Sequence, residues 1–204
     1  MSGVDRRVNG NLGARTARLM TEAGSPAIVV IALPTAVAWQ ATGYRIGQAV
    51  GWGLLVAVFS SVLPMTFILR GARRGRWDGH HVRNREGRLL PMLACLGSTL
   101  LGLAILLLGH APRDLLALDV AMLVTLGVCI VITQFWKVSL HTTVAGGALA
   151  TVVLLYGVVL LLTLPLVALV AWARVRVADH TWPQVLAGAV LGPLLGGPVF
   201  LLVR

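Results

Sequence analysis

Long apolar segments separated by short polar ones occupy most of this chain after residue 25. A helix needs about 20 apolar residues to cross the hydrocarbon of a bilayer, so each segment of that length predicts a transmembrane helix. The expected spans are 26–43, 47–69, 89–109, 114–135 and 182–203, and the longer stretch 141–173 predicts a helical hairpin that turns near Tyr156-Gly157. The sequence therefore predicts an all-α integral membrane protein, a single bundle of six or seven transmembrane helices. The number is six if the short run that contains Pro34 lies in the interface.

Composition agrees with this class of protein. Of 204 residues, 57% are hydrophobic and 12% are charged, whereas soluble domains carry roughly 25% charged residues. We expect residues 1–25 to form an Arg-rich cytoplasmic tail and residues 26–204 to form the bundle. The net charge of +10 favours membrane lipids over nucleic acid as partners, because the basic residues flank apolar helices. The seven acidic residues are too few to favour a carboxylate-built metal site.

The basic residues also predict an orientation. The expected spans place the tail, the loop 70–88 and the polar segments 136–140 and 174–181 on one face of the membrane. Three of the 17 basic residues (Arg45, Arg113 and Arg204) lie on the other face, which leaves 14 on the first. Removing the five suspected anion ligands from these 14 leaves nine against three. Because basic residues accumulate on the inner side, we expect the polar segments to face the cytoplasm.

Two of these polar segments each bring a histidine to the start of an apolar helix. His141 follows Lys137, and His180 follows Arg174 by six positions. A helix N-terminus offers unpaired N–H groups and the positive end of the helix dipole, so anions bind there. Lysine adds a charge, and arginine adds a planar fork that fits phosphate oxygens. A lone interfacial histidine is usually structural, but two with basic neighbours predict a phosphate site.

Two further patterns concern the same bundle. The loop segment with His81, Arg83, Arg85 and Arg88 runs directly into the span 89–109, so these side chains are expected beside the two histidine segments. Gly188, Gly192 and Gly196 recur every four residues in the last span, a spacing that predicts close helix packing.

These polar segments, in this order, resemble the type 2 phosphatidic acid phosphatase family of membrane lipid phosphatases, and the chain looks like a divergent member. The family motifs are Lys-x6-Arg-Pro, Pro-Ser-Gly-His and Ser-Arg-x5-His-x3-Asp. The matching positions here are His81, Arg88 and Leu89 for the first motif, Val138-Ser139-Leu140-His141 for the second, and Arg174, His180 and Gln184 for the third. The resemblance covers roughly residues 80–190, and the spacing of the third motif is its most specific part.

The resemblance implies roles for these residues. His180 would be the nucleophile that takes the phosphoryl group, and His141 would protonate the leaving group. The expected phosphate ligands are Arg174, Arg88, Lys137, Ser139, the backbone N–H near Leu140, His81 and Arg85. Lys137 is the candidate replacement for the missing lysine of the first motif. No metal or other cofactor is implied, since phosphoryl transfer needs mainly positioning and positive charge around the phosphoryl oxygens.

The departures from the family pattern concern the same residues. Gln184 replaces the aspartate that orients the nucleophilic histidine. Its amide oxygen can still accept a hydrogen bond from Nδ1, but it brings no charge to stabilise an imidazolium. An aspartate-to-asparagine change in this role lowers the rate of a serine protease by about 10⁴. Asp179 and Asp78 are candidate substitutes for the carboxylate, and Leu140 in place of glycine narrows the approach to its N–H.

The function predicted from these residues is metal-independent hydrolysis of a phosphate or diphosphate ester of an amphiphilic lipid, through a phosphohistidine. Polyprenyl or isoprenoid phosphates are favoured, because a cytoplasmic site would meet the products of prenyl synthesis. One alternative is a lipid-phosphate-binding membrane protein that has lost turnover, to which Gln184 and the altered first motif point. Another is a transporter or flippase, indicated only by the lone acidic residue Asp119 inside the span 114–135.

Overall fold

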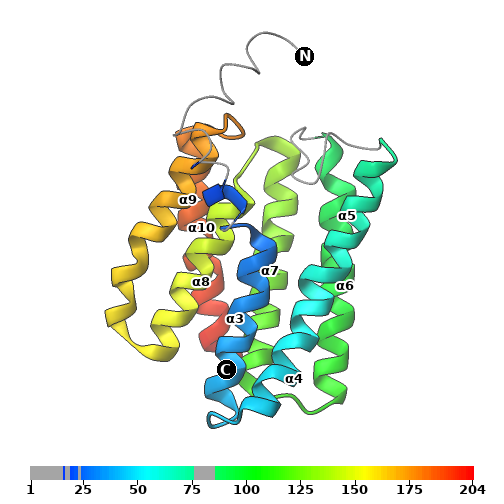
Figure 1. Ribbon diagram of the computed structural model, residues 1–204, viewed down its shortest axis with the longest axis vertical. Helices are drawn as coiled ribbons and strands as arrows, with labels where there is room; N and C mark the ends of the chain where they lie inside the picture. The colour runs from blue at the N-terminus through cyan, green and yellow to red at the C-terminus, as the bar shows by residue number, and fades with distance from the viewer. Residues whose placement is uncertain (1–15, 17–18, 23, 76–85) are drawn as a thin grey trace.

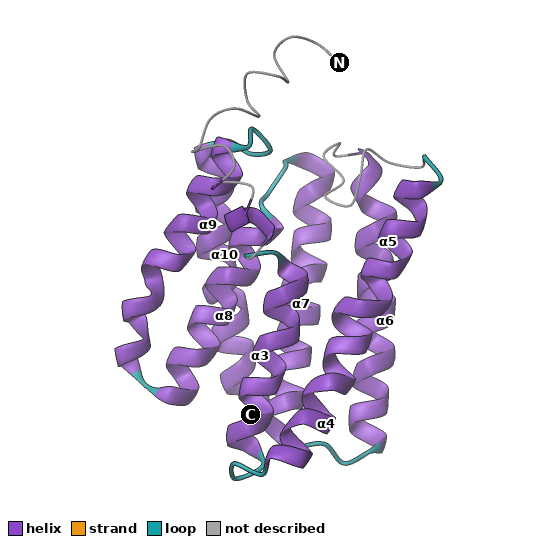
Figure 2. Ribbon diagram, in the orientation of Figure 1, coloured by secondary structure: helices purple, strands orange, loops and turns teal. Residues whose placement is uncertain are grey.

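The structure is a computed structural model that describes residues 16, 19–22, 24–75 and 86–204. All regular secondary structure in this part of the chain is helical, and the helices lie side by side in one bundle (Figures 1 and 2). The helices of the first half are α3 (Pro26–Ala41), α4 (Ile46–Ala57), the π-helical turn η1 (Val58–Val62), α5 (Leu63–Arg73), the 3₁₀ turn η2 (Glu86–Arg88), α6 (Leu89–Leu108) and α7 (Arg113–Phe135). The second half contains α8 (Leu140–Tyr156), the 3₁₀ segment η3 (Val158–Thr163), α9 (Leu164–Arg176) and α10 (Trp182–Val203).

The predicted helices are present with small shifts at their ends. Among the described residues, five continuous helices are long and apolar enough to cross a membrane: Ile46–Arg73, Leu89–Leu108, Arg113–Phe135, Val158–Arg176 and Trp182–Val203. The helices α3 and α8 are apolar but shorter, with 16 and 17 residues. The stretch 141–173 is a helical hairpin as predicted, and it turns at Gly157, whose φ of 104° is accessible mainly to glycine.

The helix α3 packs lengthwise within the bundle, although it is short and contains Pro34. Its Val37 and Ala38 are fully buried, in a core that also contains Leu106, Leu115 and Phe200. One side of α3 therefore faces other helices, while Ile28, Ile31 and Trp39 are exposed on the outside of the bundle.

The second helix continues four residues past the predicted end at 69 and contains an irregular turn. Residues Val58–Val62 form a π-helical turn between α4 and α5. Pro64 follows this turn and has no N–H to donate to the carbonyl of residue 60, so the regular hydrogen-bond ladder is interrupted there. Ser98 Oγ donates to the carbonyl of Phe59 at 2.5 Å, and Ser61 Oγ donates to the carbonyl of Ala27 at 3.0 Å. These bonds fix the irregular turn against α6 and α3.

The polar segments lie together at one end of the bundle. The links 136–139 and 177–181 lie at the upper end of the bundle in Figure 1, whereas the turns 42–45 and 109–112 and the turn between α8 and η3 lie toward the lower end. The predicted convergence of the polar segments at one end is therefore present in the fold.

Candidate phosphate site

Hydrogen bonds join the three polar segments directly. Lys137 Nζ donates to the backbone carbonyl of Asp179 at 2.6 Å, and Arg88 Nη1 donates to the backbone carbonyl of Val138 at 3.4 Å. The N–H of Ser139 donates to the carbonyl of Gln184 at 3.3 Å. Residues separated by up to about one hundred positions in the sequence therefore form one polar cluster.

The backbone between α9 and α10 positions His180. The N–H groups of Asp179 and His180 both donate to the carbonyl of Arg174, at 3.2 and 3.3 Å. Ala178, which lies between the end of α9 and Asp179, has a left-handed φ of 58°, and this residue reverses the direction of the chain. This short hook places Arg174 and His180 beside the first turn of α10.

Gln184 contacts the histidine that precedes its helix. Its Oε1 lies 3.2 Å from His180 Nδ1 and also accepts from the N–H of Thr181 at 3.1 Å. The second contact belongs to a capping box that Thr181 and Gln184 form at the start of α10. An amide oxygen can only accept, so this contact requires the proton on Nδ1 and leaves Nε2 with a lone pair. An unprotonated Nε2 can act as a nucleophile, because its lone pair is available.

Arg174 and Asp179 form a buried ion pair that sequence reasoning did not find. Arg174 is 1% exposed, and its Nη2 lies 2.9 Å from Asp179 Oδ2. Asp179 was a candidate substitute for the missing carboxylate partner of His180, but its carboxylate pairs with the arginine instead. Because a buried guanidinium needs a counter-charge, this pair explains how Arg174 stays charged inside the bundle.

Positive charge dominates the electrostatics around His180. Burial and the nearby Arg88, Arg174 and Lys137 lower the pKa of His180 to about 3, and the Gln184 contact raises it only partly. Burial and the charge of Arg174 likewise lower the pKa of Arg88 to about 10, so this guanidinium still carries its charge at neutral pH. The cluster therefore combines a neutral imidazole with permanent cations, an arrangement suited to an anion.

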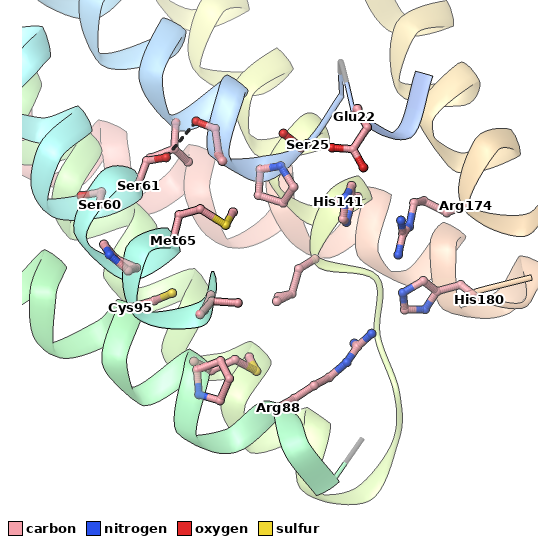
Figure 3. A pocket seen from close by; sticks show the side chains of 18 residues that line it. Glu22, Ser25, Ser60, Ser61, Met65, Arg88, Cys95, His141, Arg174 and His180 are labelled. Atoms are coloured by element: carbon pink, nitrogen blue, oxygen red, sulfur yellow. Dashed lines mark hydrogen bonds between the residues drawn. The ribbon is translucent and has the colours of Figure 1, made fainter. Parts of the chain in front are cut away.

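A cavity of about 200 Å³ opens beside this cluster (Figure 3). Arg88, His141, Arg174 and His180 line one end of it. Side chains of α3, α5 and α6 line the rest, among them Val30, Met65, Ile68, Pro91 and Met92. The titratable lining side chains therefore gather at one end, where two guanidinium groups and two imidazoles accompany one carboxylate, Glu22, and the rest of the cavity is mostly apolar.

The second motif lies at the start of α8. Ser139 is the N-cap residue of α8 and is fully buried, and its hydroxyl has no hydrogen-bond partner among the described residues. Its carbonyl accepts from the hydroxyls of Thr142 and Thr143, at 3.1 and 2.9 Å. Thr142 therefore bonds backward to Ser139 rather than capping the first N–H groups of the helix. Leu140 lines the cavity at the same helix end as His141.

Part of the segment predicted to be an Arg-rich cytoplasmic tail also lines the cavity. Glu22 and Ser25 are among the lining residues, and Figure 3 shows Glu22 beside His141. Ser25 is the N-cap of α3, and its Oγ accepts from the N–H of Ile28 at 3.4 Å. The Ser-Pro start of α3 was a visible signal for a helix N-terminus, but the sequence did not show which site it would face.

Some predicted residues are not in this cluster or cannot be placed. His81, Arg83, Arg85 and Asp78 lie outside the described residues. Asp119 is buried in α7, away from the cations, and Ser60 Oγ donates to its Oδ1 at 3.4 Å. Within residues 24–75 and 86–204 and the described part of the tail, no three His, Cys, Asp or Glu side chains gather where they could hold a metal ion.

Comparisons with protein-family models, with curated proteins and with solved structures found no match to this chain. The geometry of the site and the motif resemblance are therefore the basis for the functional proposal below.

Proposed function

We propose that this protein is an integral membrane lipid phosphatase with seven membrane crossings and a cytoplasmic active site, related to the type 2 phosphatidic acid phosphatases. Its substrate is a phosphate or diphosphate ester of an amphiphilic lipid. The observation that carries the proposal is the set around His180: an Nδ1 contact to Gln184 at 3.2 Å, with Arg88, Arg174 and Lys137 close enough to depress the pKa of the imidazole. A cavity with one cationic end and apolar walls adjoins this set.

In the first step, His180 Nε2 attacks phosphorus while the bond from phosphorus to the lipid oxygen breaks. His141 donates a proton to that leaving oxygen, so the lipid departs as an alcohol or, from a diphosphate, as a monophosphate. The Nδ1 proton stays on the imidazole, whose new positive charge Gln184 Oε1 stabilises as a hydrogen-bond acceptor. Arg88, Arg174 and Lys137 hold the charge of the phosphoryl oxygens, where most of the stabilisation in phosphoryl transfer arises.

In the second step, water attacks the phosphohistidine and the phosphorus–nitrogen bond breaks. His141, now neutral, accepts a proton from this water. Inorganic phosphate leaves, and His180 returns to its neutral state. The covalent intermediate divides one high barrier into two lower ones.

Phosphate release from a panel of lipid phosphates in detergent with EDTA tests the reaction. We expect His180→Ala to abolish release and to abolish acid-labile ³²P labelling of the protein, because the nucleophile is gone. His110 is exposed at the opposite end of the bundle, so His110→Ala is the matched control and should behave as the parent. Labelling that survives in His180→Ala would refute the assignment of the nucleophile.

A second candidate is a non-catalytic lipid-phosphate-binding protein with the same anion site. The specific observation in its favour is that Gln184, a neutral amide, contacts Nδ1, while the buried carboxylate of the neighbouring Asp179 pairs with Arg174. An imidazolium formed here would have three cations around it and no charged partner of its own. Binding of lipid phosphate without any release of phosphate would favour this candidate.

A further inference from the structure

A second cavity, of about 180 Å³, adjoins the first. The two cavities share five lining residues: Pro26, Val30, Ser60, Cys95 and Leu140. The second cavity lies among α3, α6, α7, α8 and α10, and its walls carry no charged side chain. The two cavities therefore meet at these residues, and the second, called the chamber below, has uncharged walls.

The chamber reaches far enough to hold a hydrocarbon chain. Its lining residues run from Leu140 to Thr151 on α8, eleven positions, or about 16 Å at 1.5 Å per residue. On α10 its lining residues are Gly192 and Gly196, and Gly196 lies fourteen positions, or about 21 Å, below the start of the helix at Trp182. Half of the roughly 30 Å hydrocarbon core is about 15 Å, so the chamber extends from the polar end to or beyond the bilayer midplane.

Gly196 keeps the deep end of this chamber open. Gly188 and Gly192 follow the prediction of close packing, because an added Cβ would collide with Thr142 Oγ1 and with the carbonyl of Thr143, respectively. Gly196 does not follow the prediction of close packing. A Cβ there would have only Thr125 Oγ1 within 4 Å, at 3.9 Å, and Gly196 lines the chamber.

We infer that one hydrocarbon chain of the lipid phosphate enters this chamber, and that Gly196 sets the length of chain that fits. The inference rests on the proposed function for the identity of the headgroup. An extended chain of single bonds advances about 1.2 Å per bond, as in an extended polypeptide, so the roughly 16 Å between the first and last lining residues on α8 corresponds to about 13 bonds. The preferred ligand therefore has about 14 carbons of its chain in the chamber. Selectivity arises from filling it, because a shorter chain leaves wall atoms without packing partners.

The chain carries its own probe of occupancy. Cys95 lines both cavities where they meet, and Cys129, the other cysteine, lines only the second. In a Cys129→Ala background, modification of Cys95 by N-ethylmaleimide reports whether a chain passes this junction. Alkyl phosphonates of 8, 12 and 16 carbons are suitable ligands, because their carbon–phosphorus bond is not hydrolysed by the proposed reaction.

We expect the 16-carbon phosphonate to protect Cys95 at a concentration at least tenfold below that of the 8-carbon one. Gly196→Leu should raise the half-protecting concentration of the 16-carbon ligand at least tenfold and leave that of the 8-carbon ligand within twofold. Gly97, which is exposed on α6 and has open space around an added Cβ, provides the matched control Gly97→Leu, which should change neither value. The 8-carbon value also shows that the Gly196 variant is folded.

Two results would overturn the inference. One is protection of Cys95 that does not depend on chain length. The other is a ratio of the half-protecting concentrations of the 16-carbon and 8-carbon ligands that is unchanged in Gly196→Leu. The outcome is separable from that of the proposed function. Length-dependent protection without hydrolysis of alkyl phosphates retains the chain site and rejects the phosphatase. Hydrolysis without length-dependent protection retains the phosphatase and rejects the chain site.

Discussion

Replacing Gln184 with glutamate tests the contact on which the proposed chemistry depends. Glutamate has the same length and shape as glutamine, so its carboxylate oxygen can take the place of Oε1, 3.2 Å from His180 Nδ1. It can also keep the bond from the N–H of Thr181, which is 3.1 Å long. The substitution therefore adds a negative charge beside the imidazole and leaves the capping box of α10 in place.

The size of the effect follows from this distance. An opposite charge within about 4–6 Å raises the pKa of a histidine by about 1–3 units, so the pKa of His180 should rise from about 3 to between about 4 and 6. Each unit is about 1.4 kcal/mol of stabilisation of the imidazolium. If about half of the positive charge develops in the transition state, the rate at pH 7 should rise about 3- to 30-fold. The imidazole stays mostly neutral at that pH, because its raised pKa is still below 7.

The assay is the pH dependence of phosphate release between pH 4 and 8. In the parent protein, protonation of His180 should not limit the rate in this range, because its pKa of about 3 lies below it. In Gln184→Glu the rate should rise at pH 7 and fall as the pH drops through the new pKa between about 4 and 6. Gln134 is an exposed glutamine near the same end of the bundle, so Gln134→Glu controls for added surface charge.

Two results would refute this reasoning. If the pH dependence of the rate below pH 7 is the same in Gln184→Glu as in the parent, the carboxylate does not act on His180. If the folded variant shows the fall in rate at the raised pKa and is still slower than the parent at pH 7, imidazolium character does not develop in the rate-limiting step.

Two further predictions concern the anion site and the orientation of the bundle. Arg174→Lys should weaken binding of lipid phosphate about 10- to 100-fold, because a point charge replaces a fork whose charge-assisted hydrogen bonds are worth about 1.5–3 kcal/mol; parent-like binding would remove Arg174 from the site. Arg174→Ala is less informative, since it leaves Asp179 buried without its partner. In a cysteine-free parent, Ala178→Cys should resist a membrane-impermeant thiol reagent in intact cells and His110→Cys should react, because they lie at opposite ends of the bundle. The reverse pattern would invert the proposed orientation.

The sequence by itself predicted the helices well, because an apolar segment of about 20 residues can be recognised from local composition alone. The hairpin at 141–173 was predictable, since the stretch is too long for one span and contains a glycine that can adopt the left-handed turn. The spacing from Arg174 to His180 and Gln184 was also a local signal. The contact between Gln184 and His180 arises because Gln184, in the first turn of α10, directs its side chain back to the residues before the helix in a capping box.

The tertiary structure decided which partners the polar side chains take. Nothing local told whether Asp179 would approach His180 or Arg174, because the choice depends on the hook at Ala178. The place of Glu22 beside the cavity depends in the same way on how the residues before α3 pack. Gly188, Gly192 and Gly196 share one sequence pattern, yet the first two allow close contact with α8, while an added Cβ at the third would meet mostly the open space of the chamber. Such differences arise because burial, ion pairing and open volume depend on the distances between separate helices, which a pattern along one helix does not contain.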